Sequence, residues 1–348
     1  MSRMAAPAVP LLGSGYPQTA TEPAGQAPAR VSGLSDLSAL VRPRIALMVL
    51  VTVFAAMWLT AADGTLDWLP VTTVLLGTGL VAASSSIANQ ILERGTDSLM
   101  PRTAGRPLAA GRLSPASGWL LAAGTLLTGM LSVGWAGGLG AAAVAASTWL
   151  IYVVAYTPLK RLTPLNTAVG AVAGGLPVGI GWFAADGPQR LLAGDAAGSL
   201  AVAALGTVLY LWQFPHFMAI AWLYRQQYAT AGLQMLTVAD PTGLRPAGQS
   251  LAAALALVPV SLVLAVPSGS IRLFLTAAAA SIVYAAVAVW FAIQRTDRSA
   301  RLLLLTSLAV LLALMTAAIA FGGGPPASPA AAQAARIVQP ASFLTTVS

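Results

Sequence analysis

The sequence predicts an all-α membrane protein, a polytopic bundle of about nine transmembrane helices. Of the 348 residues, 57% are hydrophobic and only 8% are charged, whereas a soluble domain carries about a quarter charged residues. Apolar stretches long enough to cross a bilayer recur along the chain, and most of the charges fall between them. We therefore expect one helical bundle embedded in the lipid bilayer rather than two soluble domains.

The apolar stretches predict the individual helices. The third and fourth stretches are separated only by a pair of glycines, and the seventh is short, so these are the places where the number of helices depends on interpretation. The expected helices span Ile45–Ala62, Pro70–Leu92, Trp119–Gly137, Leu139–Tyr156, Asn166–Ala185, Ser199–Tyr224, Leu251–Val266, Ile271–Ile293 and Leu302–Phe321.

The two ends of the chain differ in composition from this membrane domain, which we assign to residues 41–321. Residues 1–40 are rich in Ala, Pro, Gly and Ser, which predicts a disordered cytoplasmic tail. Pro7 and Pro10 interrupt its apolar stretch, so we do not expect a signal peptide. Residues 322–348, rich in Ala and Pro, predict a second disordered tail. The absence of cysteine excludes disulfides and thiolate metal sites.

The distribution of basic residues predicts the orientation in the membrane. The net charge of +8 comes from arginines and lysine that stand singly or in pairs, with no continuous basic stripe, so we do not expect a nucleic-acid partner. Alternate connections between the expected helices are basic and would lie in the cytoplasm. The basic connections contain Arg42, Arg44, Arg94, Arg102, Arg106, Arg112, Lys160, Arg161, Arg225, Arg245, Arg295, Arg298 and Arg301. This places the amino terminus in the cytoplasm and the protein in a bacterial inner membrane.

A change from apolar to polar character at the end of the second stretch marks the first candidate site. Asn89, Glu93 and Asp97 follow at intervals of four residues, and on an α-helix each is rotated by only about 40° from the one before. One helix face therefore presents an amide oxygen and two carboxylates, the oxygen ligands that Mg²⁺ prefers. Guanidinium groups that bind phosphate follow at Arg94, Arg102 and Arg106. The pattern indicates a diphosphate site with Mg²⁺ on Glu93 and Asp97; the alternative is a membrane interface whose arginines only set orientation.

Other candidate residues lie in the later connections and in the sixth expected helix. Lys160, Arg161 and Arg225 share the cytoplasmic side with the first site and are candidates for binding the same phosphates. Asn166 stands where a helix begins, so it is either a substrate contact or an N-cap. His216 is the only histidine and lies within a span after Pro215, where a polar side chain suggests function. A satisfied structural histidine is the alternative.

Four blocks of sequence together resemble the UbiA superfamily of membrane prenyltransferases, and within it the haem O synthase (protohaem IX farnesyltransferase) branch. They cover roughly residues 40–320. The first is the Asn89–Asp97 face followed by Met100-x-Arg102-Thr-x-x-Arg106-Pro-Leu. The others are Tyr156-Thr-Pro-Leu-Lys160-Arg161-x-Thr-Pro-Leu-Asn166-Thr, Trp212-Gln-Phe-Pro-His216-Phe and Ala231-Gly-x-x-Met235-Leu.

The resemblance implies an activity, a cofactor and partners. It implies that Asn89, Glu93, Asp97 and Lys160 are catalytic, that Mg²⁺ is the cofactor, and that farnesyl diphosphate is the donor. It also implies that a vinyl group of haem b accepts the farnesyl group and that the product, haem O, passes to a haem A synthase or to oxidase assembly factors. Aromatic side chains such as Tyr156 and Trp212 would stabilise the allylic cation.

One departure from this resemblance lies after the sixth expected helix. Members of the branch carry one or two acids between Arg and Tyr at this place, whereas Gln226 and Gln227 stand here. An amide oxygen is a weaker ligand of Mg²⁺ than a carboxylate. We therefore expect a raised Mg²⁺ requirement, with Asp240 replacing the missing charge.

Two other functions remain open from the sequence. One is a related prenyltransferase that modifies a phenolic ring in quinone or chlorophyll-type pathways. The other is a secondary transporter, because broken helices and polar residues within spans also occur there. Against transport, the charged residues gather at one face and the middle of the spans holds few of them.

Overall fold

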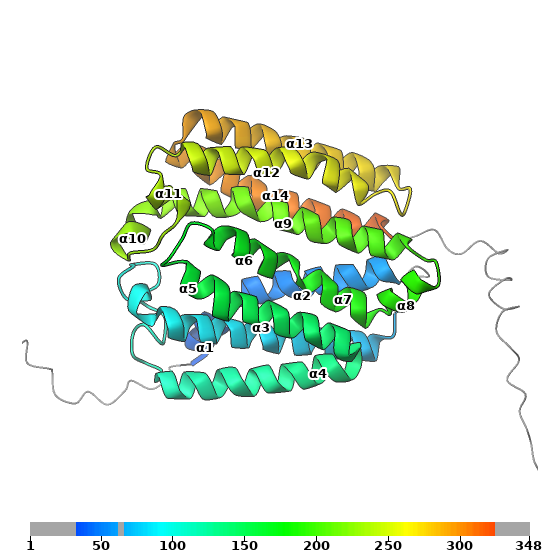
Figure 1. Ribbon diagram of the computed structural model, residues 1–348, viewed down its shortest axis with the longest axis horizontal. Coiled ribbons are helices and arrows are strands. Elements are labelled where there is room, and N and C mark those ends of the chain that lie inside the picture. Colours follow the sequence, from blue (N-terminus) through cyan, green and yellow to red (C-terminus); the bar gives the residue numbers. More distant parts are fainter. Residues whose placement is uncertain (1–32, 62–65, 324–348) are drawn as a thin grey trace, which may run out of the picture.

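The computed structural model describes residues 33–61 and 66–323, and within this part of the chain every regular element is a helix (Figure 1). The helices are α1 (Gly33–Val41), α2 (Pro43–Thr60), α3 (Trp68–Asp97), α4 (Pro115–Leu150), a π-helical turn η1 (Ile151–Tyr156), α5 (Thr157–Leu159), α6 (Asn166–Gly175), α7 (Pro177–Ala184), α8 (Gly187–Leu192), α9 (Ala197–Leu223), α10 (Arg225–Thr230), α11 (Leu236–Ala239), α12 (Leu244–Val263), α13 (Ile271–Gln294) and α14 (Asp297–Phe321). The predicted all-α class is confirmed.

Eight helical stretches among the described residues are long and apolar enough to cross a membrane, and one of them is folded back on itself. Pro115–Leu159 has 45 residues, about 68 Å if straight, more than twice the thickness of a bilayer core. Gly138 breaks it with φ 78° and ψ 173°. Ser84 then accepts a hydrogen bond from Trp149 and donates one to the carbonyl of Ala122, positions that a straight helix would hold about 40 Å apart. Counted as two, this stretch gives the nine predicted segments.

Close helix contacts depend on small residues. A Cβ atom on Gly129 of α4 would lie 2.7 Å from the carbonyl oxygen of Gly77 in α3, so these two helices meet backbone to backbone. Gly170 of α6 leaves room for the ring of Tyr156 in the same way. Small residues at crossings allow the close packing that holds membrane helices together. The largest buried apolar cluster joins α9 to α2, α12, α13 and α14.

The prediction of a disordered tail over residues 1–40 is wrong for its last part, because Gly33–Val41 forms helix α1. Residues 1–32 lie outside the described part, as do residues 324–348 of the second tail. Leu40 packs in a buried cluster with Ile87 and Leu108, and its carbonyl accepts hydrogen bonds from Ser86 and Gln90 of α3. These partners lie far away in the sequence, so the composition of the segment alone did not predict the helix.

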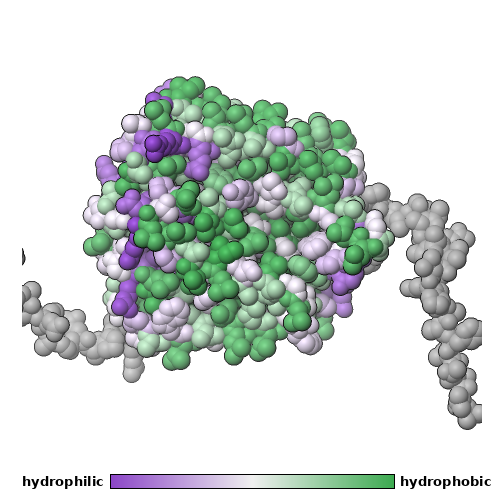
Figure 2. Space-filling view, in the orientation of Figure 1, coloured by the Kyte–Doolittle hydropathy of each residue, from purple (hydrophilic) through white to green (hydrophobic). Residues whose placement is uncertain are grey.

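The connections of the bundle gather at its two ends. The α3–α4 connection, α5, α10, α11 and the α13–α14 connection lie at one end, on the left in Figure 1, and α8 and the α12–α13 connection lie at the other. Hydrophilic residues are concentrated at the first end, and apolar residues cover the face between the ends (Figure 2). The predicted segregation of basic connections is therefore present in the fold. The end that carries α10 is called the basic end below.

Candidate active site

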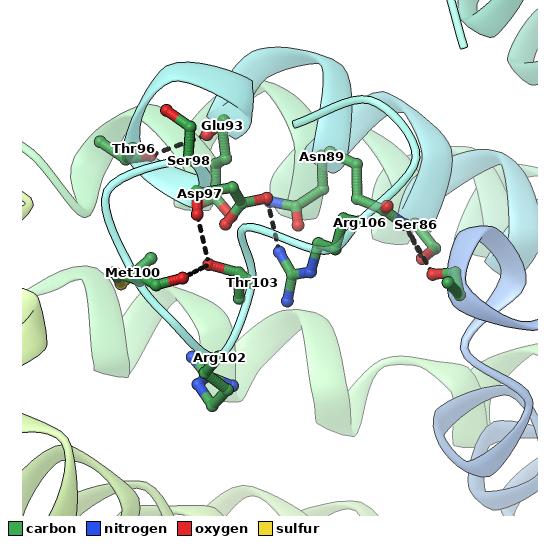
Figure 3. Close-up of polar contacts among 12 residues, drawn as sticks. Ser86, Asn89, Glu93, Thr96, Asp97, Ser98, Met100, Arg102, Thr103 and Arg106 are labelled. Carbon is green, nitrogen blue, oxygen red and sulfur yellow. Dashed lines mark hydrogen bonds and ion pairs between the residues drawn. The ribbon is translucent and has the colours of Figure 1, made fainter. Parts of the chain in front are cut away.

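The site begins on the last turns of α3, which continues beyond the predicted Leu92 as far as Asp97. The helix therefore carries Asn89, Glu93 and Asp97 on one face, as their spacing predicted, and Figure 3 shows these side chains on the same side of the helix. All three are buried, at 0%, 8% and 1% exposure respectively. Buried polar groups of this kind need partners, and the surrounding loops provide most of them.

Each carboxylate is paired with a cation from another segment. Lys160, just after α5, places its Nζ atom 2.7 Å from Oε1 of Glu93. Arg106, in the α3–α4 connection, places Nη1 2.6 Å from Oδ2 of Asp97 (Figure 3). The α3 face thus meets two chain segments whose charges complement it, and the predicted convergence of these regions is present in the structure.

The loop that delivers Arg106 is held against the end of α3. Thr103 is 1% exposed and donates a hydrogen bond of 2.9 Å to the carbonyl of Asp97. Further along, Arg112 makes two hydrogen bonds to the carboxylate of Asp36 in α1, at 2.7 and 3.2 Å, and another of 2.8 Å to the carbonyl of Gly105. Because Arg112 holds both α1 and the loop, α1 fixes the position of the loop beside the site.

Arg102 stands at the loop's turn and faces aromatic rings of the α9–α10 segment. Its guanidinium carbon lies 4.9 Å from the ring centre of Tyr224 and 5.9 Å from that of Tyr228. Its Nη2 also lies 3.3 Å from the hydroxyl of Tyr228. On the other side of the site, Lys160 Nζ lies 4.4 Å from the ring centre of Tyr156. Two of the site's cations are therefore held by aromatic faces, whose attraction for a cation is general.

Asn166 ties two connections together and does not cap its helix. Its amide donates hydrogen bonds to the carbonyl of Thr163 at 2.7 Å and to that of Gln234 at 3.0 Å. The backbone N–H of Gln234 in turn donates to the carbonyl of Lys160 at 2.6 Å. The N-cap of α6 is Leu165, so the N-cap alternative for Asn166 is wrong. Asn166 instead holds the segment that carries Lys160.

Several predicted site residues do not join this cluster. Arg94 and Arg161 are exposed. Arg225 pairs with Asp297 at 2.9 Å and donates to the carbonyl of Trp222, so it links α10 to α14. His216 lies two turns before the end of α9, with its Nδ1 atom 2.7 Å from Oγ of Ser307 in α14.

Arg42 is a site residue that the sequence did not single out. It lies between α1 and α2 in a left-handed conformation, with φ 52°. Its charge acts on Glu93, Asp97 and Arg106. Burial and the charge of Arg42 lower the pKa of Arg106 below the ordinary arginine value. In the sequence Arg42 was interpreted only as an orientation signal, because nothing linked it to residues more than forty positions away.

The residues Gln226, Gln227 and Asp240, where the sequence departs from the resemblance, do not form a second set of metal ligands in the structure. Oε1 of Gln227 is buried without a hydrogen-bond partner among the described residues, and Gln226 is exposed. Asp240 uses both carboxylate oxygens within its own turn, accepting from Thr242 at 2.5 and 3.1 Å and from the N–H of Arg245 at 2.7 Å. Hydrogen bonding to Thr242 and Arg245 lowers the pKa of Asp240. The structure therefore gives no support to Asp240 as a replacement ligand.

The oxygen atoms on the α3 face fit a hard cation. Asn89 donates to Thr157 at 3.0 Å, whereas its Oδ1 is buried without a hydrogen-bond partner among the described residues. A buried acceptor left unpaired is costly unless a ligand completes it. This oxygen lies one helical turn from Glu93 and two from Asp97, so the three residues together offer the amide and carboxylate oxygens that suit Mg²⁺.

Lys160 keeps its charge in this site. Burial disfavours the ammonium, but Tyr156 and Glu93 act in the opposite direction and the pKa of Lys160 is raised above the ordinary lysine value. The site therefore contains positive charge on Lys160, Arg106 and Arg42, which act on the two carboxylates, and Arg102 adds another in the adjoining loop. An arrangement of this kind suits a multiply charged anion together with a divalent cation.

Comparison with protein families agrees with this geometry. Residues 49–309 match the model of the UbiA prenyltransferase family. A protein of Rhodopirellula baltica named protoheme IX farnesyltransferase is 42% identical over 288 residues, covering 79% of this chain and 96% of its own length. A protein of the same name from Solibacter usitatus is 39% identical over 295 residues, covering 79% of this chain and 94% of its own.

Comparison with solved structures shows a shared fold. A structure described as digeranylgeranylglyceryl phosphate synthase superimposes with a TM-score of 0.66 and 14% identity, covering 83% of this chain and 98% of its own. A UbiA homologue from Archaeoglobus fulgidus bound to GPP and Mg²⁺ gives a TM-score of 0.57 at 15% identity, covering 82% and 99%.

Proposed function

Since the chain belongs to the UbiA prenyltransferase family, we propose that it transfers a farnesyl group from farnesyl diphosphate to a vinyl group of haem b, giving haem O. The observation that carries this proposal is the buried face of Asn89, Glu93 and Asp97, matched by cations from two other segments. The relatives named protoheme IX farnesyltransferase, which align over most of their length, support the choice of haem and farnesyl.

The donor's diphosphate binds where the cations of the site converge. Lys160, Arg106 and Arg42 act on the carboxylates of the α3 face, and Arg102 stands in the adjoining loop beside Tyr228. A diphosphate that enters there offers oxygens to guanidinium and ammonium groups. The residues Asn89, Glu93 and Asp97 would hold Mg²⁺, which when bound neutralises the charge of the diphosphate. Arg106 and Lys160 then hold the departing diphosphate oxygens as negative charge develops on them.

Bond cleavage between the farnesyl C1 atom and the diphosphate oxygen leaves an allylic cation. The vinyl group of haem b donates its π electrons to C1, so that a carbon–carbon bond forms and the positive charge moves to the carbon next to the porphyrin ring. Water then adds at that carbon and loses a proton, giving a hydroxyethylfarnesyl group. Tyr156, beside Lys160, presents an aromatic face near the site that favours the cation.

The protein would act as a multi-pass protein of a bacterial inner membrane, with the basic end and the amino-terminal side in the cytoplasm. The arginines and lysine of the connections at that end support this orientation. Haem O leaves as a lipid-soluble product, and a haem A synthase or an oxidase assembly factor would receive it.

Expression in a bacterium that lacks its own haem O synthesis tests the function directly. Extracted haems are separated and analysed by mass spectrometry, and we expect a haem whose mass has increased by a farnesyl group and one hydroxyl group. Glu93→Gln is the matched inactive control, because it keeps the size of the side chain and removes its charge. A prenylated phenol in place of haem O would identify the related prenyltransferase activity, and the absence of any prenylated product would refute the assignment.

A further inference from the structure

A second polar network lies inside the bundle, away from the carboxylate face, and it connects α9, α13 and α14. Nδ1 of His216 lies 2.7 Å from Oγ of Ser307. The indole N–H of Trp212 donates to the carbonyl of Ser307 at 2.7 Å, and the hydroxyl of Tyr284 donates to the carbonyl of Trp212 at 2.9 Å. Every member of this network is hydrogen-bonded to a residue of another helix, so the network holds the three helices in a fixed relation.

The hydroxyl of Ser307 faces Nδ1 of His216, and the hydrogen bonds of this hydroxyl assign the tautomer of the ring. This hydroxyl has one proton, and it donates that proton to the carbonyl of Leu304 at 2.6 Å. With that proton donated to Leu304, the oxygen of Ser307 accepts from His216, which corresponds to the tautomer that carries its N–H on Nδ1. A charged imidazolium inside an apolar span is expensive, so the ring is neutral. Nε2 of His216 is then left with an available lone pair.

The ring is also fixed in orientation. Trp212 stacks on it with ring centres 4.7 Å apart and planes inclined by 24°, and the indole is itself held by Ser307. Nε2 makes no hydrogen bond to any residue that the structure describes. Metal-bound histidines show the same arrangement, with one ring nitrogen donating to a fixed acceptor and the other facing the metal. A purely structural histidine of this kind would leave half of its polar capacity unused.

The position of His216 agrees with a role toward the acceptor. It lies seven residues before Leu223, the end of α9, or about 10 Å along the helix axis. That end of α9 continues into α10, whose Tyr228 contacts Arg102 of the donor site. His216 therefore lies about two helical turns deeper in the bundle than the end of α9.

We propose that Nε2 of His216 is the axial ligand of the haem iron of the acceptor, and that Ser307 and Trp212 position its imidazole for this purpose. The inference rests on the proposed function, because haem b enters as the substrate. Since the chain has a single histidine and no cysteine, the protein supplies one nitrogen ligand. The bound ferrous haem is therefore expected to have one axial histidine and to leave its other face open to carbon monoxide.

Haem b titration of the purified protein, prepared without a histidine tag, tests the proposal independently of turnover. Resonance Raman spectra of the ferrous complex should show an iron–histidine stretch, which His216→Ala abolishes and added imidazole restores. Ser307→Ala keeps the imidazole but removes its partner, and we expect haem affinity to fall by about 10- to 100-fold. Thr207→Ala, at an exposed position of the same helix, is the matched control, and its spectrum should equal that of the parent.

A parent-like spectrum in folded His216→Ala would overturn the proposal, even if the protein makes haem O. If His216→Ala does not fold, isotope-labelled histidine gives a single ring signal in the unaltered protein, because there is only one histidine. A proton on Nε2, or no change of this signal when haem b binds, would equally overturn it. A parent that binds no haem b would refute the proposed function itself.

Discussion

Removal of the Lys160 charge should lower the free energy of unfolding, and this effect can be measured separately from the loss of activity. Glu93 is 8% exposed, and Lys160 is its only side-chain partner among the described residues, at 2.7 Å. Lys160→Gln would leave a buried carboxylate without a cation, and breaking a buried pair in this way costs about 3–5 kcal/mol. Because the side chains of the pair retain 14% and 11% exposure, solvent reduces the loss, and we expect about 2–3 kcal/mol.

Two further variants test whether the loss of stability in Lys160→Gln arises from the broken pair with Glu93. Glu93→Gln leaves Lys160 with the ring of Tyr156 at 4.4 Å, so its loss should be smaller, about 1 kcal/mol. The double variant Glu93→Gln/Lys160→Gln contains no unpaired charge and should be more stable than Lys160→Gln alone, giving a coupling of at least about 1 kcal/mol.

Thermal unfolding in detergent, followed by tryptophan fluorescence, measures these differences. The midpoint of Lys160→Gln should fall by about 5–10 °C, and the double variant should recover most of the fall. None of the three variants should make haem O. Equal midpoints for the parent and Lys160→Gln, or a double variant as unstable as the sum of the singles, would refute the reasoning.

Four other predictions concern the loop, the metal, the pH response and the topology. Asp36→Asn removes the carboxylate that holds Arg112 and should raise the KM for farnesyl diphosphate several-fold, whereas Arg190→Gln at the opposite end, whose pair with Asp195 is 3.8 Å long, should not. Asp240→Asn should leave the Mg²⁺ requirement of haem O formation unchanged, because the carboxylate oxygens of Asp240 are hydrogen-bonded within its own turn. Gln227→Asp should lower this requirement. A changed requirement in Asp240→Asn would support the hypothesis that Asp240 replaces the charge missing at Gln226 and Gln227. Because the folded pKa of Lys160 is raised, its stabilisation is present below the unfolded value and is lost only as pH rises through the folded value. The difference in unfolding midpoint between the parent and Lys160→Gln should therefore be constant between about pH 7 and about pH 9, and a difference that vanishes in this range would contradict the sign. A reporter active only outside the cytoplasm should be silent when fused near Arg112 and active near Gly187, and the opposite result would invert the orientation.

Much of the fold and part of the site could be predicted from the sequence, because they depend on local spacing. Hydrophobic runs determine where helices cross a membrane, and the intervals between Asn89, Glu93 and Asp97 determine that they share a face. Gly138 breaks the long stretch at the glycine pair where a division between two helices was expected.

The remaining features depend on partners distant in the sequence. Helix α1 forms because Leu40 and Asp36 meet α3 and Arg112, and neither contact is visible in the composition of the segment. Arg225 has the sequence context of a phosphate ligand, yet it pairs with Asp297, 72 positions away. Arg42 shows the opposite case, since its closeness to Asp97 arises only when α1 folds onto α3. The sequence alone does not distinguish charged residues that form structural ion pairs from those that belong to the site, because the difference depends on how the helices pack.

The pairing of both site carboxylates with cations has a consequence for turnover. Before substrate arrives, Lys160 and Arg106 are paired with Glu93 and Asp97, so these two cations are not available to free phosphate from the cytoplasm. When the prenyl group has left, inorganic diphosphate has lost the apolar tail that anchored it in the bundle. The two carboxylates then compete with it for the same cations. Re-formation of the two ion pairs thus favours release of the product and returns the protein to the state that accepts the next donor.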